Sequence, residues 1–428
     1  MNTFFYYAKK LVPGFVLRAI RPPYHYTLSF LGALWYGFPS RKIIVIGVTG
    51  TKGKSSVVEI TSAVFESAFM RTALAGTIRF KIGDTSRPNM YKMTMPGRFF
   101  VQKFLADAVR EKCDVAVLEM TSEGVKQYRH KWIALDALIF TNLSPEHIES
   151  HGSLEKYVAA KLELAHTLAR SRKRPRRMIA NSDNEYGKAF LAYDIEENIP
   201  YSLTDLDFYT LGNDGASLVI DGVTLRTPLI GLFNIYNMLA AIACARTFGI
   251  SLKTIEKALV ALPPIRGRVE KFESPSGARK HIIAVVDYAH TPDSLTQFYQ
   301  AFSGKEKICV LGNTGGGRDS WKRPEMGRIA EEQCAHVILT NEDPYDENPR
   351  AIVNAMAEGI TDKNKLSIIM DRREAIREAI RRAPDQSVVL ISGKGTDPYI
   401  MGPRNTREVW SDAEVVQEEM TRLFGENN

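Results

Sequence analysis

The sequence predicts an α/β protein with two domains built on mainly parallel sheets, preceded by a short helical arm. Apolar runs of strand length alternate with helical patterns through most of the chain, which is typical of a parallel sheet wrapped by helices. A glycine-rich loop follows the first such run and opens a helical pattern. With 428 residues the chain is too long for one ordinary core, so two or three domains are expected.

The composition is that of a soluble globular protein, with 44% hydrophobic and 25% charged residues. Much of the net charge of +7 lies in one basic run between Arg172 and Arg177. A solvated loop after a helix is the favoured interpretation of this run. Nucleic-acid binding is the minor one, because no aromatic-interleaved basic patch accompanies the run. No nucleic-acid partner is therefore predicted.

The four cysteines, Cys113, Cys244, Cys309 and Cys334, are scattered and form no C-x-x-C pair. Neither a zinc site nor a disulfide framework is expected from this spacing. Such cysteine usage indicates a reducing compartment, and the predicted location is cytoplasmic.

Residues 1–41 form the predicted arm. Aromatic and aliphatic side chains alternate there with basic ones, and residues 24–38 carry no formal charge apart from His25. This run is shorter than the roughly 20 residues that a membrane-spanning helix needs, and no cleavage site of small residues is evident. A basic, aromatic, amphipathic arm can lie on a membrane surface, which would place the protein at the inner face of the membrane. Packing on its own domain or on a partner subunit is equally open.

The central domain is predicted to span residues 42–264. Its expected strands are residues 42–48, 114–120, 137–142 and 177–181, and its expected helices are residues 55–69, 99–112, 154–171 and 235–248. Between residues 200 and 228, short segments punctuated by glycine and aspartate indicate a small antiparallel insert. The pair Pro263 and Pro264 marks the linker to the next domain.

The C-terminal domain, residues 265–428, repeats the alternation. Its expected strands are residues 282–287, 307–311, 336–340, 366–370 and 388–392, with helices between them. This pattern predicts a second, doubly wound domain, whose ligands bind beyond the carboxyl ends of the strands. Polar segments follow those ends at residues 312–318, 340–344 and 392–397.

The segment G-V-T-G-T-K-G-K-S-S, from residue 47, predicts a nucleotide site between a strand and a helix. Gly50 and Gly53 allow backbone N–H groups to turn toward phosphate oxygens. Lys54 can reach the outer phosphates, and Ser55 can bind Mg²⁺. The strict P-loop pattern would place another glycine where Val48 stands, so a generic glycine-rich turn is the competing interpretation. We expect ATP and Mg²⁺ as cofactors.

Other candidate side chains follow other strand ends. Glu119 ends an apolar run, where a carboxylate can hold Mg²⁺ beside the glycine-rich loop; an exposed acid is the alternative. His147 belongs to a loop that crowds two histidines and two acids. Lys161 lies inside a helical pattern and, from spacing alone, would be a surface lysine. Asp287 follows a strand, and Arg268 lies at the domain junction, where a cation can contact phosphate.

Five segments follow one another along the chain. After the glycine-rich loop they are L-E-M-T-S-E-G-V-K-Q-Y-R from residue 118, T-N-L-S-P-E-H-I-E-S-H-G from 141, D-Y-A-H-T-P-D-S-L from 287 and S-G-K-G-T-D from 392. Together they resemble the Mur ligase family, and most closely its MurE type, which adds the third amino acid to the muramoyl dipeptide of peptidoglycan precursors. The resemblance covers nearly all of the chain after the arm.

The resemblance implies an ATP-dependent ligase. ATP would phosphorylate a muramoyl-peptide carboxylate, and the amino group of an amino acid would attack the acyl phosphate. The implied catalytic residues are Lys54, Glu119, His147 and Lys161. The implied magnesium ligands are Ser55, Glu119, His147 and Lys161, the last as a carbamate. The implied ATP contacts are Gly50, Thr51, Lys52, Gly53, Lys54, Ser55, Ser56, Asn234, Asn237, Arg268 and Asp287. The implied substrate contacts are Thr94, Thr121, Ser122, Gln127, Arg129, Asp343, Asp346, Lys394 and Asp397.

Three departures from the family pattern concern the substrates. The family's N-terminal UDP-binding domain is expected to be missing, because 41 residues are too few to build it, and a lipid-linked muramoyl peptide is the hypothesis that this suggests. Tyr345 replaces the arginine of the D-N-P-R segment in diaminopimelate-adding enzymes. Diaminopimelate is therefore not favoured, and lysine, ornithine or another amine is open; Asp346 and Asp397 could bind a cationic side chain. Glu123 replaces the family's histidine, and Thr396-Asp397 replaces His-Glu.

Two other functions stay open. One is another ligase of the superfamily, of the folylpolyglutamate or cyanophycin type, although D-Y-A-H-T-P-D differs from the D-G-A-H-N-P usual in the folate branch. The other is a non-catalytic ATP-binding partner in a complex. The joint presence of Lys54, Glu119, His147 and Lys161 favours catalysis.

Overall fold

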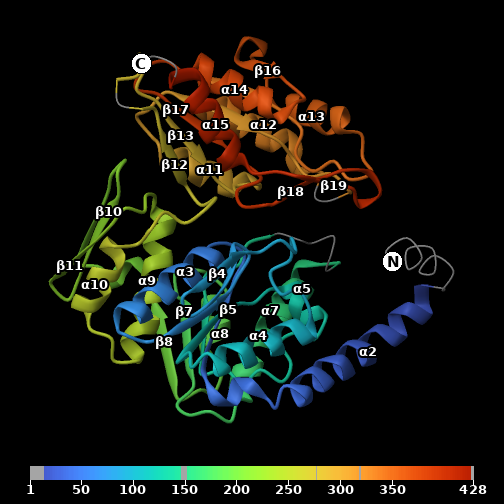
Figure 1. Cartoon of the computed structure of the whole chain (residues 1–428), viewed down its shortest axis with the longest axis vertical. Coiled ribbons are helices and arrows are strands. Elements are labelled where there is room, and N and C mark those ends of the chain that lie inside the picture. Colours follow the sequence, from blue (N-terminus) through green and yellow to red (C-terminus); the bar gives the residue numbers. More distant parts are fainter. Residues whose placement is uncertain (1–13, 146–151, 276, 318–319, 426–428) are drawn as a thin grey trace. The chain divides into compact units, whose positions relative to one another are not determined.

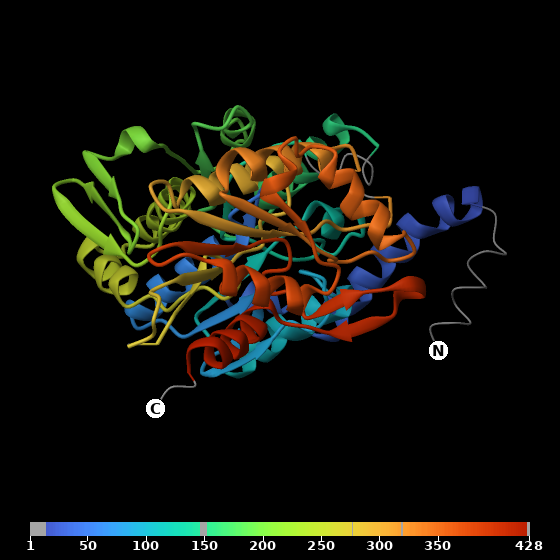
Figure 2. The same cartoon turned by 90° about the horizontal axis from the view of Figure 1, so that it is seen from above.

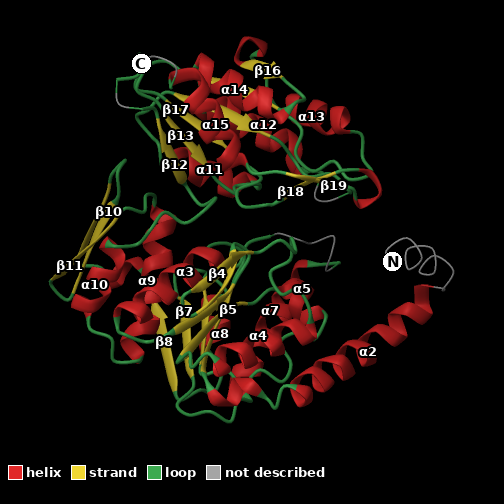
Figure 3. Ribbon diagram, in the orientation of Figure 1, coloured by secondary structure: helices red, strands yellow, loops and turns green. Residues whose placement is uncertain are grey.

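A computed structural model of the chain describes residues 14–145, 152–275, 277–317 and 320–425. The chain divides into two compact units, the first made of residues 1–144, 154–203 and 239–254 and the second of residues 145–153, 204–238 and 255–428. Each unit combines helices with a sheet that is mainly parallel, which confirms the predicted fold class (Figures 1 and 3). The predicted domain boundary between residues 264 and 265 stays a prediction.

The first unit contains an eight-stranded sheet with the order β4-β3-β2-β5-β1-β6-β7-β8. Its elements are α2 (Gly14–Trp35), η1 (Pro39–Lys42), β1 (Ile44–Thr49), α3 (Lys54–Ser67), β2 (Thr72–Ala75), β3 (Arg79–Ile82), β4 (Thr85–Pro88), α4 (Arg98–Arg110), β5 (Val115–Glu119), α5 (Ser122–Lys126), β6 (Ala137–Phe140), α7 (Leu154–Ala169), β7 (Arg177–Asn181), α8 (Gly187–Leu191) and β8 (Glu197–Tyr201). Strand β1 lies between β5 and β6 and runs parallel to both. The loops after these three strands therefore meet at one edge of the sheet.

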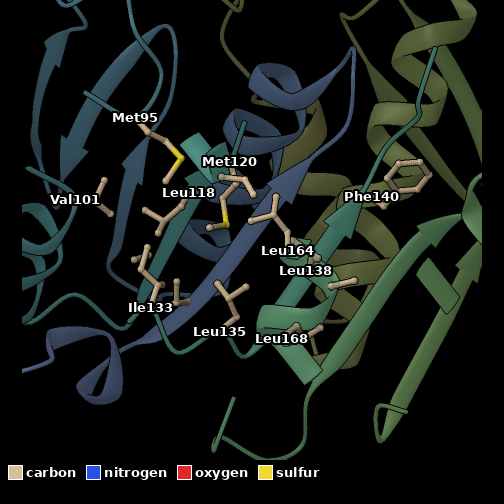
Figure 4. Close-up of a cluster of buried hydrophobic side chains, with 14 of the residues drawn as sticks. Met95, Val101, Leu118, Met120, Ile133, Leu135, Leu138, Phe140, Leu164 and Leu168 are labelled. Atoms are coloured by element: carbon tan, nitrogen blue, oxygen red, sulfur yellow. The ribbon is translucent and has the colours of Figure 1, made fainter. Parts of the chain in front are cut away.

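The core of the first unit follows from strands that are apolar on both faces. Every residue of β5 and β6 is buried, as expected for central parallel strands. Leu118 and Leu138 of the sheet pack with Leu164 of α7 on one face (Figure 4). Helix α3 packs against β1, β2 and β5, and its Phe65 ring lies 5.3 Å from that of Phe248.

The arm forms the helix α2, which packs against α4. The helix continues through Pro22 and Pro23, and its Ser29 and Ala33 are buried. Among the helices that the structure describes, none has the length and apolar character needed to cross a membrane.

The second unit contains a six-stranded sheet with the order β12-β13-β17-β14-β15-β16, parallel except for β12. Its elements are η2 (Leu203–Asp205), β9 (Phe208–Leu211), β10 (Ala216–Ile220), β11 (Val223–Thr227), α9 (Leu232–Thr247), α10 (Leu252–Val260), β12 (Glu270–Glu273), β13 (Ile283–Val286), α11 (Pro292–Gln300), β14 (Lys307–Leu311), α12 (Lys322–Gln333), β15 (His336–Leu339), α13 (Pro349–Ala357), η3 (Lys363–Lys365), β16 (Leu366–Ile368), α14 (Arg372–Arg382), β17 (Val388–Ile391), β18 (Tyr399–Met401), η4 (Pro403–Asn405), β19 (Arg407–Val409) and α15 (Asp412–Phe424); η2, α9 and α10 cross the division between the units.

Helices cover both faces of this sheet, as a doubly wound fold requires (Figure 2). Residues of α11, α12 and α13 pack on one face, and residues of α14 and α15 pack on the other. Strands β9, β10 and β11 form a separate antiparallel sheet, which confirms the predicted insert.

One expectation about the cysteines is wrong. Cys309 of β14 and Cys334, which follows α12, form a disulfide. Their spacing of 25 residues gave no sign of the bond, because the strand and the helix end meet only in the folded sheet. Cys113 and Cys244 are free and buried.

Candidate active site

The glycine-rich loop, residues 50–53, connects β1 to α3. Gly50 has a φ of +147° and Gly53 a φ of +80°, which residues with a side chain rarely adopt. A Cβ atom on Gly50 would lie 1.9 Å from Oγ1 of Thr141. Lys54 is the first residue of α3, and its Nζ donates to the carbonyl of Thr51 over 2.8 Å. The loop thus sets a cation at the start of a helix, which suits phosphate.

The segment after β6 holds this loop in place. The backbone N–H of Thr51 donates to the carbonyl of Asn142 over 2.8 Å, and the N–H of Lys52 donates to Oδ1 of Asn142 over 2.9 Å. Thr141 Oγ1 donates to the carbonyl of Lys52 over 2.6 Å. Sequence reasoning missed both residues as parts of the site, although they lie in the T-N-L-S-P segment at a predicted strand end.

Ser55 and Glu119 meet beside the loop. Ser55 Oγ donates to Oε2 of Glu119 over 3.1 Å, and both residues are buried. Thr77, which sequence reasoning also missed, donates to the same carboxylate from its N–H over 2.8 Å and from its Oγ1 over 3.0 Å. Hydroxyl and carboxylate oxygens are ligands that Mg²⁺ prefers, usually with several waters. The pair therefore fits a magnesium ion.

No group of three or more His, Cys, Asp or Glu side chains that could hold a metal ion occurs in the part of the chain that the structure describes. His147 falls outside the described residues, so its predicted role as a ligand stays a prediction.

Lys161 of α7 is a buried residue, with 1% of its surface exposed. Its Nζ donates to the carbonyl of Gly50 over 2.6 Å and lies 4.7 Å from the ring centre of Tyr157. The Tyr157 hydroxyl is 3.1 Å from Oγ1 of Thr51. The interpretation of Lys161 as a surface lysine, drawn from spacing alone, is wrong, and the helix α7 brings the amine directly to the glycine-rich loop.

The predicted substrate residues of the first unit lie around Glu119. Oγ1 of Thr94 is 2.7 Å from Oγ1 of Thr77, which bonds to Glu119. Thr121 caps α5 by accepting from the N–H of Gly124 over 3.1 Å, and Ser122 is buried next to it. Thr94 is thus linked to Glu119 through Thr77, and Thr121 and Ser122 follow Glu119 closely in the chain.

Gln127 and Arg129 lie beside Arg98 and His25, two residues that sequence reasoning missed, and the two arginines make this group positively charged. Arg129 donates to the carbonyl of Met95 and, over 2.6 Å, to Oε1 of Gln127. Arg98 donates to the carbonyl of Gln127 over 3.3 Å and contacts Nδ1 of His25. Burial, and then the charge of Arg98, lower the pKa of Arg129. The arm therefore contributes His25 to the surroundings of the predicted substrate residues.

The second unit carries the other predicted ATP contacts. Asn234 and Asn237 are buried on α9, where Asn237 Nδ2 donates to Oδ1 of Asn234 over 3.0 Å. The guanidinium of Arg268 lies 4.5 Å from the ring centre of Tyr288. Asp287 accepts from the N–H groups of Val269 and Ala289 over 2.9 and 2.7 Å. Burial raises the pKa of Asp287 even though Arg268 acts to lower it.

The remaining predicted substrate residues gather beyond the carboxyl ends of β15 and β17. Lys394 is fully buried; its Nζ donates to Oδ1 of Asp343 over 2.8 Å and lies 3.4 Å from Oδ2 of Asp397. Oδ1 of the exposed Asp346 accepts from the N–H of Arg404 over 2.6 Å. Glu342, missed by sequence reasoning, is buried with its Oε2 lacking a hydrogen-bond partner among the described residues. Burial raises the pKa of Glu342.

Comparison with known protein families finds two regions of the chain that match a family. The Mur ligase middle domain matches residues 48–245, and the Mur ligase glutamate ligase domain matches residues 267–395. The UDP-N-acetylmuramoyl-L-alanyl-D-glutamate–2,6-diaminopimelate ligase of Syntrophomonas wolfei is 34% identical over 389 residues, which cover 87% of this chain and 77% of that protein. The ligase of the same name from Chlamydia felis is 32% identical and covers 94% of this chain and 83% of its own length.

Solved structures agree with these matches. A structure of a diaminopimelate ligase of the same name aligns with a TM-score of 0.59 and 27% identity, over 89% of this chain and 78% of that chain. Folylpolyglutamate synthase of Mycobacterium tuberculosis, complexed with ADP, aligns with a TM-score of 0.68 and 17% identity over 86% of this chain and 92% of that chain, a likeness of fold alone. From the two matching domains and the extent of the similarity, the chain belongs to the Mur ligase family.

Proposed function

We propose that this chain is a MurE-type, ATP-dependent ligase that joins an amino acid to the carboxylate of a muramoyl peptide in the synthesis of peptidoglycan precursors. The contact of Ser55 with Glu119 beside the glycine-rich loop supports this most directly, because it sets two oxygen ligands next to a phosphate-binding backbone. A carboxylate oxygen of the acceptor takes the outer phosphoryl group of ATP and ADP leaves. The amino group then attacks the acyl carbon, loses a proton, and phosphate leaves as the amide forms.

Each residue of the site has a proposed task in this reaction. The loop N–H groups and Lys54 hold the outer phosphates. Ser55 and Glu119 hold Mg²⁺, which neutralises charge on the transferring phosphoryl group when it is bound. Asn234, Asn237, Arg268 and Asp287 are the proposed contacts to the rest of the nucleotide, and His147 is a proposed ligand of a second metal ion.

Lys161 is proposed to carry a carbamate. Its neutral amine would add CO₂ and release a proton, which turns a cation into an anion able to support Mg²⁺. Two observations support this: the amine is buried, with 1% of the residue exposed, and it lies 2.6 Å from the carbonyl of Gly50 in the nucleotide loop.

The proposed acceptor contacts are Thr94, Thr121, Ser122, Gln127 and Arg129. A carboxylate or phosphate of the acceptor suits the part of the site around Arg129, because the positive charge of Arg98 lies close to that of Arg129.

The amino acid added is proposed to have a cationic side chain, such as lysine or ornithine. The relatives are named as diaminopimelate ligases, but Tyr345 stands in this chain where an arginine would grip a distal carboxylate. Asp343 and Asp397 already flank Lys394, whereas Asp346 is exposed and bonds only a backbone N–H among the contacts observed. An exposed carboxylate at this place favours an ammonium group over a second carboxylate.

We also propose a cytoplasmic location at the inner face of a membrane. The first 58 residues contain no aspartate or glutamate, so every charged side chain of the arm and of the start of the first unit is basic. A lipid-linked muramoyl peptide is then the alternative acceptor, since it would be presented at that surface.

The test is release of phosphate from ATP with Mg²⁺, UDP-N-acetylmuramoyl-L-alanyl-D-glutamate and a panel of lysine, ornithine and diaminopimelate, with the product mass recorded. A product one amino acid heavier is expected, with lysine or ornithine preferred. Lys54→Ala should abolish turnover, and Lys188→Ala serves as the control at a lysine outside the site. ATP binding without turnover for any amine, with the soluble or the lipid-linked acceptor, would contradict the proposal and favour a non-catalytic ATP-binding role.

A further inference from the structure

Helix α2 carries an apolar face that is exposed in the described structure. Five exposed side chains form this face, which we call the outer face: Ile20, Tyr24, Leu31, Leu34 and Trp35. Trp35 is 80% exposed. With 3.6 residues per helical turn, positions 20, 24, 31 and 35 fall on one side of the helix, and position 34 lies beside them. Single exposed apolar side chains are ordinary, but a row of five along one helix marks an interaction surface.

The opposite face of α2 is already occupied by the first unit. Ser29 Oγ donates to the carbonyl of Tyr128 over 2.5 Å. The rings of Tyr26 and Phe30 lie 5.7 and 4.9 Å from the ring of Trp132. These contacts attach the C-terminal half of the helix to the first unit, whereas its N-terminal half extends away from the unit (Figure 1). The outer face is therefore the one available to a partner.

The charged residues of α2 and of the segments on either side of it have one sign. Glu59 is the first acidic residue of the chain, whereas residues 1–42 contain Lys9, Lys10, Arg18, Arg21, Arg41 and Lys42. Among these, Arg21, Arg41 and Lys42 are exposed in the structure, near the two ends of the outer face. Each basic residue close to an anionic lipid surface contributes on the order of 1 kcal/mol of attraction.

We infer that the outer face of α2 docks on a membrane that contains anionic lipids. Tyr24 and Trp35 stand toward its two ends, and such rings favour the level of the lipid headgroups. The aliphatic members then enter the boundary with the acyl chains while the basic residues meet headgroup phosphates. A second copy of this chain fits the surface less well, because a two-fold contact would bring the same basic residues of both copies together.

Docking would bring the proposed acceptor site to the membrane surface. Tyr128, which accepts the hydrogen bond from Ser29, stands between the proposed acceptor contacts Gln127 and Arg129. This step alone rests on the proposed function; the docking itself does not depend on ligase chemistry.

Co-sedimentation without ATP tests the docking. The chain should bind vesicles of phosphatidylglycerol and phosphatidylcholine, bind vesicles of phosphatidylcholine alone more weakly, and lose affinity as salt rises. The double variant Leu31→Glu, Trp35→Glu should bind anionic vesicles at least about tenfold more weakly. Phe69→Glu is the matched control, because Phe69 is a fully exposed aromatic residue elsewhere in the first unit; its binding should equal that of the wild type.

The inference would be overturned if the double variant bound anionic vesicles as strongly as the wild type, or if the wild type did not co-sediment with them. A dimer in sedimentation velocity that the double variant abolishes, without vesicle binding, would assign the outer face to a second copy instead. Thermal unfolding of both variants verifies their folding, which is expected because the substituted side chains are exposed. Vesicle binding in a chain without ligase activity would refute the proposed function and leave the docking intact.

Discussion

Ser55 and Glu119 are 64 residues apart in sequence, yet the hydroxyl of the first donates to the carboxylate of the second over 3.1 Å. Ser55 belongs to the first turn of α3, which follows β1, and Glu119 is the last residue of β5. The two strands are parallel neighbours, with Val48 opposite Glu119. The order of the sheet therefore builds one site from two distant segments.

Glu119→Gln should remove the charge that a magnesium ion needs while keeping the size of the side chain. We expect kcat to fall on the order of 10²-fold or more, and the Mg²⁺ concentration for half-maximal rate to rise. Ser55→Ala should have a smaller effect, because water can replace one oxygen ligand of Mg²⁺. Initial rates over a range of Mg²⁺ concentrations test both variants. A wild-type Mg²⁺ dependence in Glu119→Gln would contradict the assigned role of this carboxylate.

The parts of the site that could be predicted from sequence are those that carry charge or belong to a motif at a strand end. Glu119 and Lys54 are of this kind. Thr77 was missed, because a neutral side chain that orients a carboxylate leaves no pattern in the sequence. Asn142 was missed although it lies in a segment at a strand end, because only the charged residues of that segment were considered. Lys161 was assigned through the family resemblance alone, since helical spacing does not show that a lysine is buried.

The secondary structure also divides into elements that the sequence predicts and elements that it does not. The central strands β1, β5 and β14 were predicted within two residues of their ends, because continuous apolar runs indicate buried parallel strands. Strand β8, E-N-I-P-Y, was not predicted, because an edge strand with alternating exposure and a proline carries little of that signal. The disulfide was missed because pairing depends on tertiary contact and not on spacing.

A carbamate on Lys161 predicts that the reaction depends on CO₂. Turnover should fall when CO₂ is removed from the buffer and recover when bicarbonate is added, because the carbamate is in equilibrium with the free amine. Lys161→Ala should be inactive under both conditions, and labelled bicarbonate should give a carbamate signal in ¹³C NMR that this variant lacks. Equal rates with and without CO₂, and no such signal, would show that the free amine is the working form.

Gly50→Ala should damage nucleotide binding for a steric reason. The new Cβ would lie 1.9 Å from Oγ1 of Thr141, which bonds the loop to β6. We expect the Kd for ATP to rise by an order of magnitude or more, as measured by calorimetry. Gly222→Ala is the matched control: its φ is also positive, at +73°, but no atom lies within 4 Å of its added Cβ. That variant should lose about 1 kcal/mol of stability and keep its affinity for ATP.

The pH dependence of stability should show the ion pair of Glu196 with Arg176. Hydrogen bonds from Arg176 lower the pKa of Glu196 from 4.5 to about 2. A carboxyl group with a lowered pKa stabilises the folded state above its unfolded pKa and loses that contribution as pH falls through the folded value. The Tm difference between the wild type and Glu196→Gln should therefore be constant near neutral pH and vanish as pH falls from about 4.5 to about 2. Because the pair is partly exposed, the difference should be small and shrink in high salt.

His25 connects the arm to the proposed acceptor contacts, and its removal should affect the acceptor and not ATP. His25 contacts Arg98, which donates to the carbonyl of Gln127 over 3.3 Å. A hydrogen bond to a charged group contributes roughly 1.5–3 kcal/mol, so His25→Ala should raise the acceptor KM on the order of tenfold. The KM for ATP and the binding to anionic vesicles should stay at wild-type values, because His25 belongs neither to the glycine-rich loop nor to the outer face of α2. Thr27→Ala, at an exposed position two residues further along the same helix, is the control for the kinetics and should leave both KM values unchanged. If His25→Ala lowers kcat and weakens ATP binding together, the arm acts on the folding of the whole unit and not on the acceptor site.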